Sequence, residues 1–129
     1  MTYLWVALGG ALGSVARYAC SGAAVRWLGA AFPYGTLFVN VTGSFAIGLL
    51  AALAATDGRP SLGTDARAFL LVGVLGGFTT FSSFSLETLN LARSGALGPA
   101  ALNVVLSIAL CLFGAWLGFA AAGLLNRMG

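Results

Sequence analysis

One stretch of the sequence, Gly76 to Ser85, carries polar groups where an ordinary membrane helix would carry Leu and Val. Two adjacent glycines precede five Ser or Thr hydroxyls, inside an apolar segment that runs from about Ala66 to Leu91. Irregular backbone at membrane depth is tolerated only where protein buries it or a watery cavity adjoins it. Gly, Ser and Thr also let membrane helices pack closely. The stretch is therefore either a binding site or pathway, or a helix-packing seam.

The phenylalanines of this stretch are spaced for one helix face. Phe81 and Phe84 are three residues apart, and Ser85 falls beside Phe81 if the helix resumes there. Aromatic ring edges carry partial positive charge. Ring edges with nearby hydroxyl and amide donors would bind an anion weakly in a narrow space, which suits conduction. The other interpretation is packing in the core or against lipid. A helix break at Gly76-Gly77 would also free backbone carbonyls that suit a small cation such as Na⁺.

Two polar side chains in other apolar runs could join such a site. Arg17 lies 14 residues into the first run, about 20 Å along a helix. A charge at that depth usually faces a cavity or the bundle interior. It could form an electropositive vestibule for anions, extend to the far interface, or pair with Glu87. Asn40 shares a helix face with Gly43 and Ser44, and its amide could join two helices or donate to an anion.

Composition excludes several function classes. The 129 residues are 60% hydrophobic and 7% charged, whereas soluble domains carry roughly 25% charged residues. The net charge of +3 is too small and too dispersed for nucleic acid. The sequence has no His, no paired carboxylates and no nucleophile beside a base, so we expect no enzyme. Cys20 and Cys111 lie in apolar runs without metal-ligand spacing, which favours small buried residues over a zinc or redox site.

The fold class predicted is an all-α, multi-pass membrane protein with one domain, residues 1–129. A membrane helix needs about 20 mostly apolar residues, and four runs qualify, with the third expected to be broken mid-membrane. The first run lacks a preceding basic segment, so we expect a retained span and no cleaved signal peptide. The four runs extend from about Tyr3 to Trp27, Tyr34 to Ala55, Ala66 to Leu91 and Gly98 to Leu125.

The arginines hardly specify which way up this chain inserts. With four spans, one side carries Arg59, Arg67 and Arg127, and the other carries Arg26 and Arg93. Because Lys and Arg set orientation, such a balance predicts insertion in both directions and an antiparallel pair, unless the count is noise.

Small residues recur four apart in every run, the spacing that lets helix backbones approach. A four-helix unit this small leaves little interior room, so we expect a pathway to need a second subunit. The pairs are Gly9 with Gly13, Ser44 with Gly48, Gly73 with Gly77, and Gly114 with Gly118.

Four blocks, in order over nearly the whole chain, resemble the Fluc/CrcB family of small bacterial fluoride channels. The third block is highly specific as a run inside a membrane helix, and the fourth is weaker. The blocks are Gly9 to Gly13 with Arg17-Tyr18; Pro33 and Gly35 to Leu37 with Asn40 and Gly43 to Phe45; Gly76 to Glu87; and Leu106-Ser107 to Trp116-Leu117-Gly118.

The resemblance implies an antiparallel, dual-topology homodimer in the bacterial cell (inner) membrane. Two pores per dimer would export toxic fluoride passively. By the same resemblance, Asn40 donates to fluoride, and Phe81 and Phe84 line the pores with their ring edges. A structural Na⁺ at the dimer centre would be held by backbone carbonyls of Gly76 and Thr79 from both subunits.

The remaining family positions map with less certainty. The first-helix arginine corresponds to Arg17, at a vestibule, while Ser82, Ser107 and Glu87 correspond to polar groups along the pore. Departures are small: Ser83 stands where Thr is more usual, and Thr42 stands where an apolar residue is commoner.

Two other functions remain open at this point. A small dual-topology multidrug exporter would also have four helices, but proton coupling needs a membrane carboxylate, for which Glu87 is the candidate. A non-transporting membrane scaffold would explain the small-residue pairs but not the polar stretch with its phenylalanines.

Overall fold

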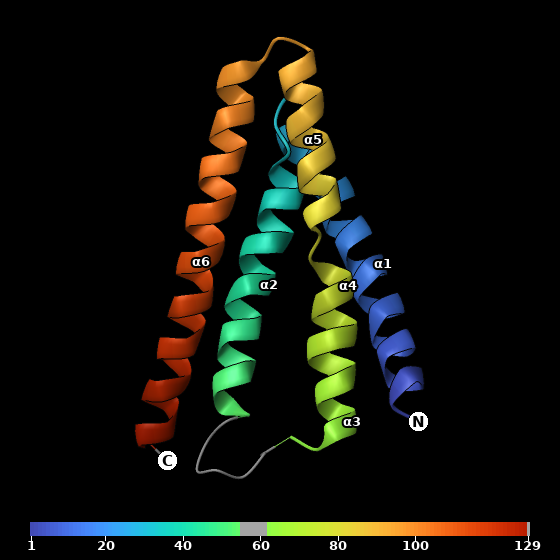
Figure 1. Ribbon diagram of the computed structural model, residues 1–129, viewed down its shortest axis with the longest axis vertical. Helices are drawn as coiled ribbons and strands as arrows, with labels where there is room; N and C mark the ends of the chain where they lie inside the picture. The colour runs from blue at the N-terminus through green and yellow to red at the C-terminus, as the bar shows by residue number, and fades with distance from the viewer. Residues whose placement is uncertain (55–61, 129) are drawn as a thin grey trace.

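The protein is an elongated bundle of helices (Figure 1). The computed structural model describes residues 1–54 and 62–128, with backbone alone for 126–128. Three helices are continuous: α1 (Thr2–Leu28), α2 (Tyr34–Leu53) and α6 (Leu97–Met128). Both termini lie at the end of the bundle where α3 begins, and the turn from α5 to α6 lies at the opposite end.

The third apolar run forms a chain of shorter helical pieces. They are α3 (Thr64–Arg67), the π-helix η2 (Ala68–Leu75), α4 (Gly76–Phe78) and α5 (Phe81–Arg93). Thr79 and Thr80 between α4 and α5 are extended, with φ/ψ of −85°/157° and −155°/118°. The run is therefore broken within its length, as predicted.

The position of the break differs from the prediction. Gly76 and Gly77 remain helical, and the two threonines that follow them are extended. A Cβ on Gly77 would come 2.6 Å from the Gly10 carbonyl oxygen, so this glycine serves the close contact of α4 with α1. β-Branched threonine suits extended backbone, and the Thr80 side chain caps α5 by accepting from the Ser83 amide.

Glycines set the two main helix contacts. The helix α1 packs along η2 and α4, and α2 packs along α6. A Cβ on Gly9 or Gly13 would collide with backbone of the η2–α4 segment, and a Cβ on Gly48 or Gly118 with backbone of the α2–α6 pair. The predicted packing role of these small residues is confirmed, because each seam brings two backbones together. Ser44 instead lines a cavity.

Among the described residues, three helical segments are long and apolar enough to cross a membrane: Tyr34–Leu53, Thr64–Arg93 and Leu97–Leu125. These match the second, third and fourth predicted runs. The first run forms α1, 27 residues long, which is not among the three. The connection between the second and third predicted runs, residues 56–65, lies mostly outside the described residues, and Arg59 lies outside them.

Tight turns join the helices at the other end. Gly29 ends α1 and Gly95 follows α5, both with φ of 84°, a conformation that glycine adopts without strain. The Gly29 amide donates to the Val25 carbonyl at 3.0 Å and closes the last turn of α1. Pro33 precedes the first residue of α2. These short connections hold α1 beside α2 and α5 beside α6.

Candidate functional site

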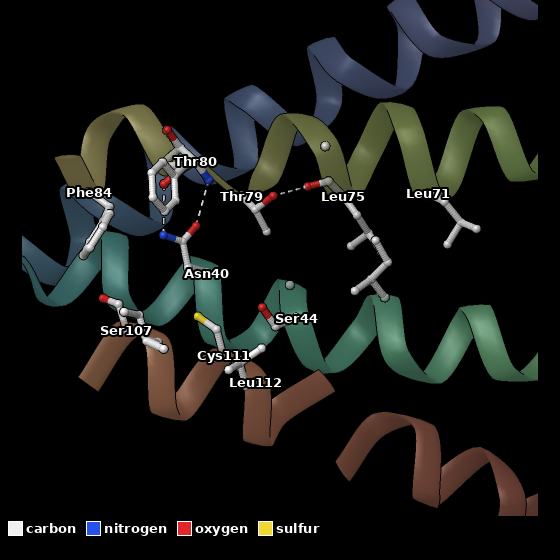
Figure 2. A pocket seen from close by; sticks show the side chains of 15 residues that line it. Asn40, Ser44, Leu71, Leu75, Thr79, Thr80, Phe84, Ser107, Cys111 and Leu112 are labelled. Atoms are coloured by element: carbon white, nitrogen blue, oxygen red, sulfur yellow. Dashed lines mark hydrogen bonds between the residues drawn. The ribbon is translucent and has the colours of Figure 1, made fainter. Parts of the chain in front are cut away.

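A cavity of about 620 Å³ lies where the broken segment meets α2 and α6 (Figure 2). Its wall includes residues of α2, η2, α4, α5 and α6, and both threonines of the break. Six of the sequence-predicted site residues line it: Asn40, Gly76, Thr79, Phe81, Phe84 and Ser107. The fold thus brings together residues that are up to 67 positions apart, counted from Asn40 to Ser107.

Asn40 bonds the backbone of the break in two places. Its Nδ2 donates to the Thr80 carbonyl oxygen at 3.0 Å, and its Oδ1 accepts from the Thr80 amide at 2.7 Å. The side-chain oxygen therefore replaces the helical acceptor that the Thr80 amide has lost, and the side-chain nitrogen adds a donor to the Thr80 carbonyl. Since Nδ2 carries two hydrogens, one N–H is left for another acceptor in the cavity.

The break redirects the amides that would close an unbroken helix. In a regular helix, the Thr80 amide would bond the Gly76 carbonyl and the Ser83 amide would bond the Thr79 carbonyl. Here the Thr80 amide donates to Asn40, and the Ser83 amide donates to the Thr80 hydroxyl at 3.2 Å. The Gly76 and Thr79 carbonyls consequently lose their helical donors, and such oxygens suit a hard cation.

The two phenylalanines form one aromatic pair with unequal burial. Their ring centroids lie 5.1 Å apart at an interplanar angle of 51°. Phe84 is 8% exposed, whereas Phe81 is 77% exposed on the surface of the single chain. The predicted shared face is confirmed, because both rings line the cavity. The cavity wall is therefore exposed at Phe81 in the single chain.

Ser107 supplies a buried hydroxyl without a partner. The residue is 7% exposed, and its Oγ has no hydrogen bond among the described residues. A buried polar atom left unsatisfied costs about 1–3 kcal/mol, so this hydroxyl would be stabilised by a bound partner. Ser44 and Cys111 line the same space from α2 and α6.

Three predicted site residues do not line the cavity. Arg17 is half-buried on α1, and its Nε donates to the Gly77 carbonyl at 3.0 Å. The alternative of a pair with Glu87 is wrong among the described residues, and extension to the far interface stays a prediction. Glu87 instead accepts from the Thr36 hydroxyl at 2.8 Å, and its Oε2 is buried without a partner. Ser82 is exposed, and its hydroxyl oxygen lies 3.2 Å from that of Thr80.

The sequence interpretation did not single out Thr80 as a site residue. Thr80 is the residue on which the break depends, since its backbone binds Asn40 and its hydroxyl caps α5. Hydroxyl residues are favoured at such helix starts, so a Thr directly ahead of the Phe81 helix was an available signal. Cys111 was assigned to plain burial, yet it lines the cavity.

A comparison with protein families decides the relationship. The family model described as "CrcB-like protein, Camphor Resistance (CrcB)" matches residues 4–119. This chain belongs to the CrcB family. The resemblance inferred from the sequence blocks is confirmed. Its members' shared region thus includes α1, α2, the whole broken segment and most of α6.

Curated relatives are similar over nearly the full chain. A protein of Opitutus terrae is 58% identical over 98% of this chain and 96% of its own length, and one of Rhodospirillum rubrum is 55% identical over 98% of both. A third, of Methylocella silvestris, is 47% identical over 99% of this chain and 98% of its own length. Each of these relatives is named "Fluoride-specific ion channel FluC".

Proposed function

We propose that this protein is a membrane channel selective for fluoride, and not an enzyme. The carrying observation is that Asn40, Phe81, Phe84 and the unpartnered Ser107 hydroxyl line one cavity at the helix break. The relatives' names support the same function. The chain carries fluoride passively out of the cytoplasm and so lowers its toxicity there.

The cavity supports this function through weak, distributed donors. An isolated anion in an apolar medium faces a cost of tens of kcal/mol. The free N–H of Asn40, the Ser107 hydroxyl and the ring edges of Phe81 and Phe84 offer partial positive charge that offsets this cost. No full positive charge lines the cavity among the described residues, so an anion can leave as readily as it enters.

The groups outside the cavity fit the approach to it. Arg17 uses its Nε on the Gly77 carbonyl, and its other N–H donors are available to attract anions into a vestibule. Ser82 and Glu87 lie on α5, the helix that carries both phenylalanines, and we assign them to the polar path beyond the rings.

The functional unit is an antiparallel homodimer with two pores, in dual topology. Phe81 is 77% exposed in the single chain although it belongs to the cavity wall, which supports a second copy closing the path. The arginine balance supports insertion in both directions. In this unit α1 is the fourth span beside the three apolar ones, within the bacterial inner membrane.

A structural Na⁺ at the centre of this dimer fits the carbonyl geometry. The Gly76 and Thr79 carbonyls have lost their helical amide donors, and two such oxygens from each subunit would surround one ion. The ion would supply positive charge that holds the two breaks together. Oxygen ligands of this kind suit a hard monovalent or divalent cation.

Fluoride efflux from liposomes tests the function directly. Purified protein is reconstituted in vesicles loaded with potassium fluoride, a potassium ionophore is added, and a fluoride electrode records release. We expect rapid fluoride release and slow chloride release from parallel vesicles loaded with potassium chloride. Fluoride release no faster than that from protein-free vesicles would overturn the proposal.

A further inference from the structure

Asn103 is a fully buried polar residue that has no place in the cavity wall. It lies on α6, and its side chain is 1% exposed. Its Nδ2 donates to the Thr88 hydroxyl at 2.8 Å, although 15 residues separate them. Burial of an amide is costly unless it is hydrogen-bonded, so this pair is a specific contact between α5 and α6.

The contact continues to the pore phenylalanine. The Thr88 hydroxyl has one proton, which it donates to the Phe84 carbonyl at 2.7 Å, so it accepts from Asn103. The three groups thus form a directed chain from α6 to the Phe84 backbone. Hydrogen bonds in such a chain polarise and strengthen one another, and the bond to Phe84 fixes the rotamer of Thr88.

The chain lies one helical turn from the cavity on both helices. Phe84 precedes Thr88 by four residues on α5, and Ser107 follows Asn103 by four on α6, so each pair shares a helix face. Phe84 and Ser107 both line the cavity. The Asn103–Thr88 contact therefore lies one turn from the part of the cavity wall that Phe84 and Ser107 form.

α5 needs such a contact because the extended residues uncouple it from α4. Thr79 and Thr80 interrupt the helical ladder, so side-chain contacts orient α5. On the side of α2, the Thr36 hydroxyl donates to Glu87 of α5 at 2.8 Å. Among the residues that the structure describes, Asn103 to Thr88 is the side-chain hydrogen bond that joins α5 to α6. Rotation of α5 about its axis would move the Phe84 ring relative to Ser107.

We propose that Asn103 is a positioning residue for the anion path. Through Thr88, it fixes the rotation of α5 relative to α6, and hence the gap between the Phe84 ring and the Ser107 hydroxyl. This inference rests on the proposed function. A fixed narrow gap favours a small anion, so loss of the contact both slows fluoride and weakens the discrimination against chloride.

The competing explanation is that the pair only holds the helices together, as buried amides do between membrane helices. The two explanations differ in what an apolar replacement does. A Leu–Val pair at these positions would restore packing but leave the Phe84 carbonyl without its second donor. Stability would then recover while conduction would not.

The test uses the full-length protein in liposomes with four variants: Thr88→Val, Asn103→Leu, the double variant of these two, and Thr88→Ser. Thr88→Val and Asn103→Leu each lower the fluoride efflux rate about fivefold to tenfold, the effect of one lost hydrogen bond. The double variant releases fluoride no more slowly than either single variant, because each single substitution already breaks the same series of hydrogen bonds. It melts at the wild-type temperature in detergent but keeps the lowered fluoride/chloride ratio.

Two comparisons complete the experiment. Thr88→Ser retains the hydroxyl and recovers most of the rate that Thr88→Val loses. Ser94→Ala removes an exposed hydroxyl at the end of α5, which bonds only the Leu91 carbonyl, and leaves efflux unchanged. If Asn103→Leu is not recovered as folded protein, the comparison of Thr88→Val with Thr88→Ser decides between the positioning role and simple packing.

The inference is overturned if Thr88→Val conducts fluoride at the wild-type rate and selectivity, or if the double variant regains both along with its stability. Either result would leave the wild-type channel intact, and would reduce the pair to packing. Failure of the proposed function is a different result, because the wild-type protein itself would then release no fluoride.

Discussion

Asn40 binds Thr80 through both its side-chain oxygen and its side-chain nitrogen, at 2.7 and 3.0 Å. One amide side chain therefore satisfies the extended backbone of Thr80, which a membrane interior would otherwise not tolerate. The same side chain keeps one N–H for the cavity. Holding the break and donating to an anion are thus compatible duties of one residue.

Replacing Asn40 separates these two duties. Asn40→Asp keeps an oxygen for the Thr80 amide but loses the donor and adds negative charge beside the path. We expect fluoride efflux to fall to the rate of protein-free liposomes while the protein still elutes as folded oligomer. Asn40→Ala removes both bonds and lowers the free energy of unfolding by about 1–3 kcal/mol, which thermal melting in detergent measures.

Thr42→Val is the matched control on the same helix. The Thr42 hydroxyl bonds only within its own helix, to the Phe38 carbonyl at 2.7 Å and more weakly to that of Val39. We expect normal efflux and a normal melting temperature. Normal efflux in Asn40→Asp would remove Asn40 from the fluoride path. Its role would then be limited to holding the Thr80 backbone at the helix break.

The aromatic pair gives a second prediction. Replacing Phe81 or Phe84 by Ile retains an apolar side chain but removes the ring edge, so fluoride loses a source of partial positive charge. We expect each variant to abolish or cripple efflux while the dimer persists on size exclusion. Phe113→Ile, on an exposed face of α6, is the control. Wild-type flux in both Phe81→Ile and Phe84→Ile would exclude the rings from the pore.

The sequence was sufficient for the helical segments. The predicted second run, Tyr34 to Ala55, agrees with α2, which ends at Leu53, because an uninterrupted apolar run with Pro33 before it leaves little ambiguity. The break was predicted in the right run but at Gly76-Gly77. Glycine is a poor helix former in isolation, yet close contact with α1 keeps Gly77 helical.

Contacts between residues far apart in the chain could not be predicted from the sequence. Arg17 and Gly77 are 60 residues apart, and only the packing of α1 on α4 brings the guanidinium to that carbonyl. Helical spacing placed Asn40 correctly on an inward face. It did not decide whether the Asn40 amide joins two helices or donates to an anion. The choice depends on Thr80, whose extended backbone no local pattern reveals.

Sodium dependence is the third prediction. If Na⁺ binds the Gly76 and Thr79 carbonyls at the dimer centre, it stabilises the folded dimer by mass action, about 2.7 kcal/mol at a hundredfold excess over the dissociation constant. We expect the melting temperature to fall when N-methylglucamine replaces sodium at constant ionic strength. Replacement of chloride by gluconate at constant sodium is the control. Equal melting temperatures in sodium and in N-methylglucamine would contradict a sodium site at these carbonyls.

Two glycines of one helix give a matched test of the packing seam. A Cβ on Gly13 would collide with the Val74 carbonyl and lie 2.8 Å from the Phe78 amide nitrogen, whereas a Cβ on Gly10 meets nothing within 4 Å. Gly13→Ala should therefore lower the free energy of unfolding by about 1–3 kcal/mol through overpacking. Gly10→Ala should leave it unchanged or raise it slightly, since Ala favours helix. Thermal melting of both variants in one detergent measures the difference, and equal melting temperatures would mean that α1 shifts freely on η2. Because Arg17 lies one turn beyond Gly13 on α1, Gly13→Ala should also weaken its bond to Gly77 and slow efflux in proportion.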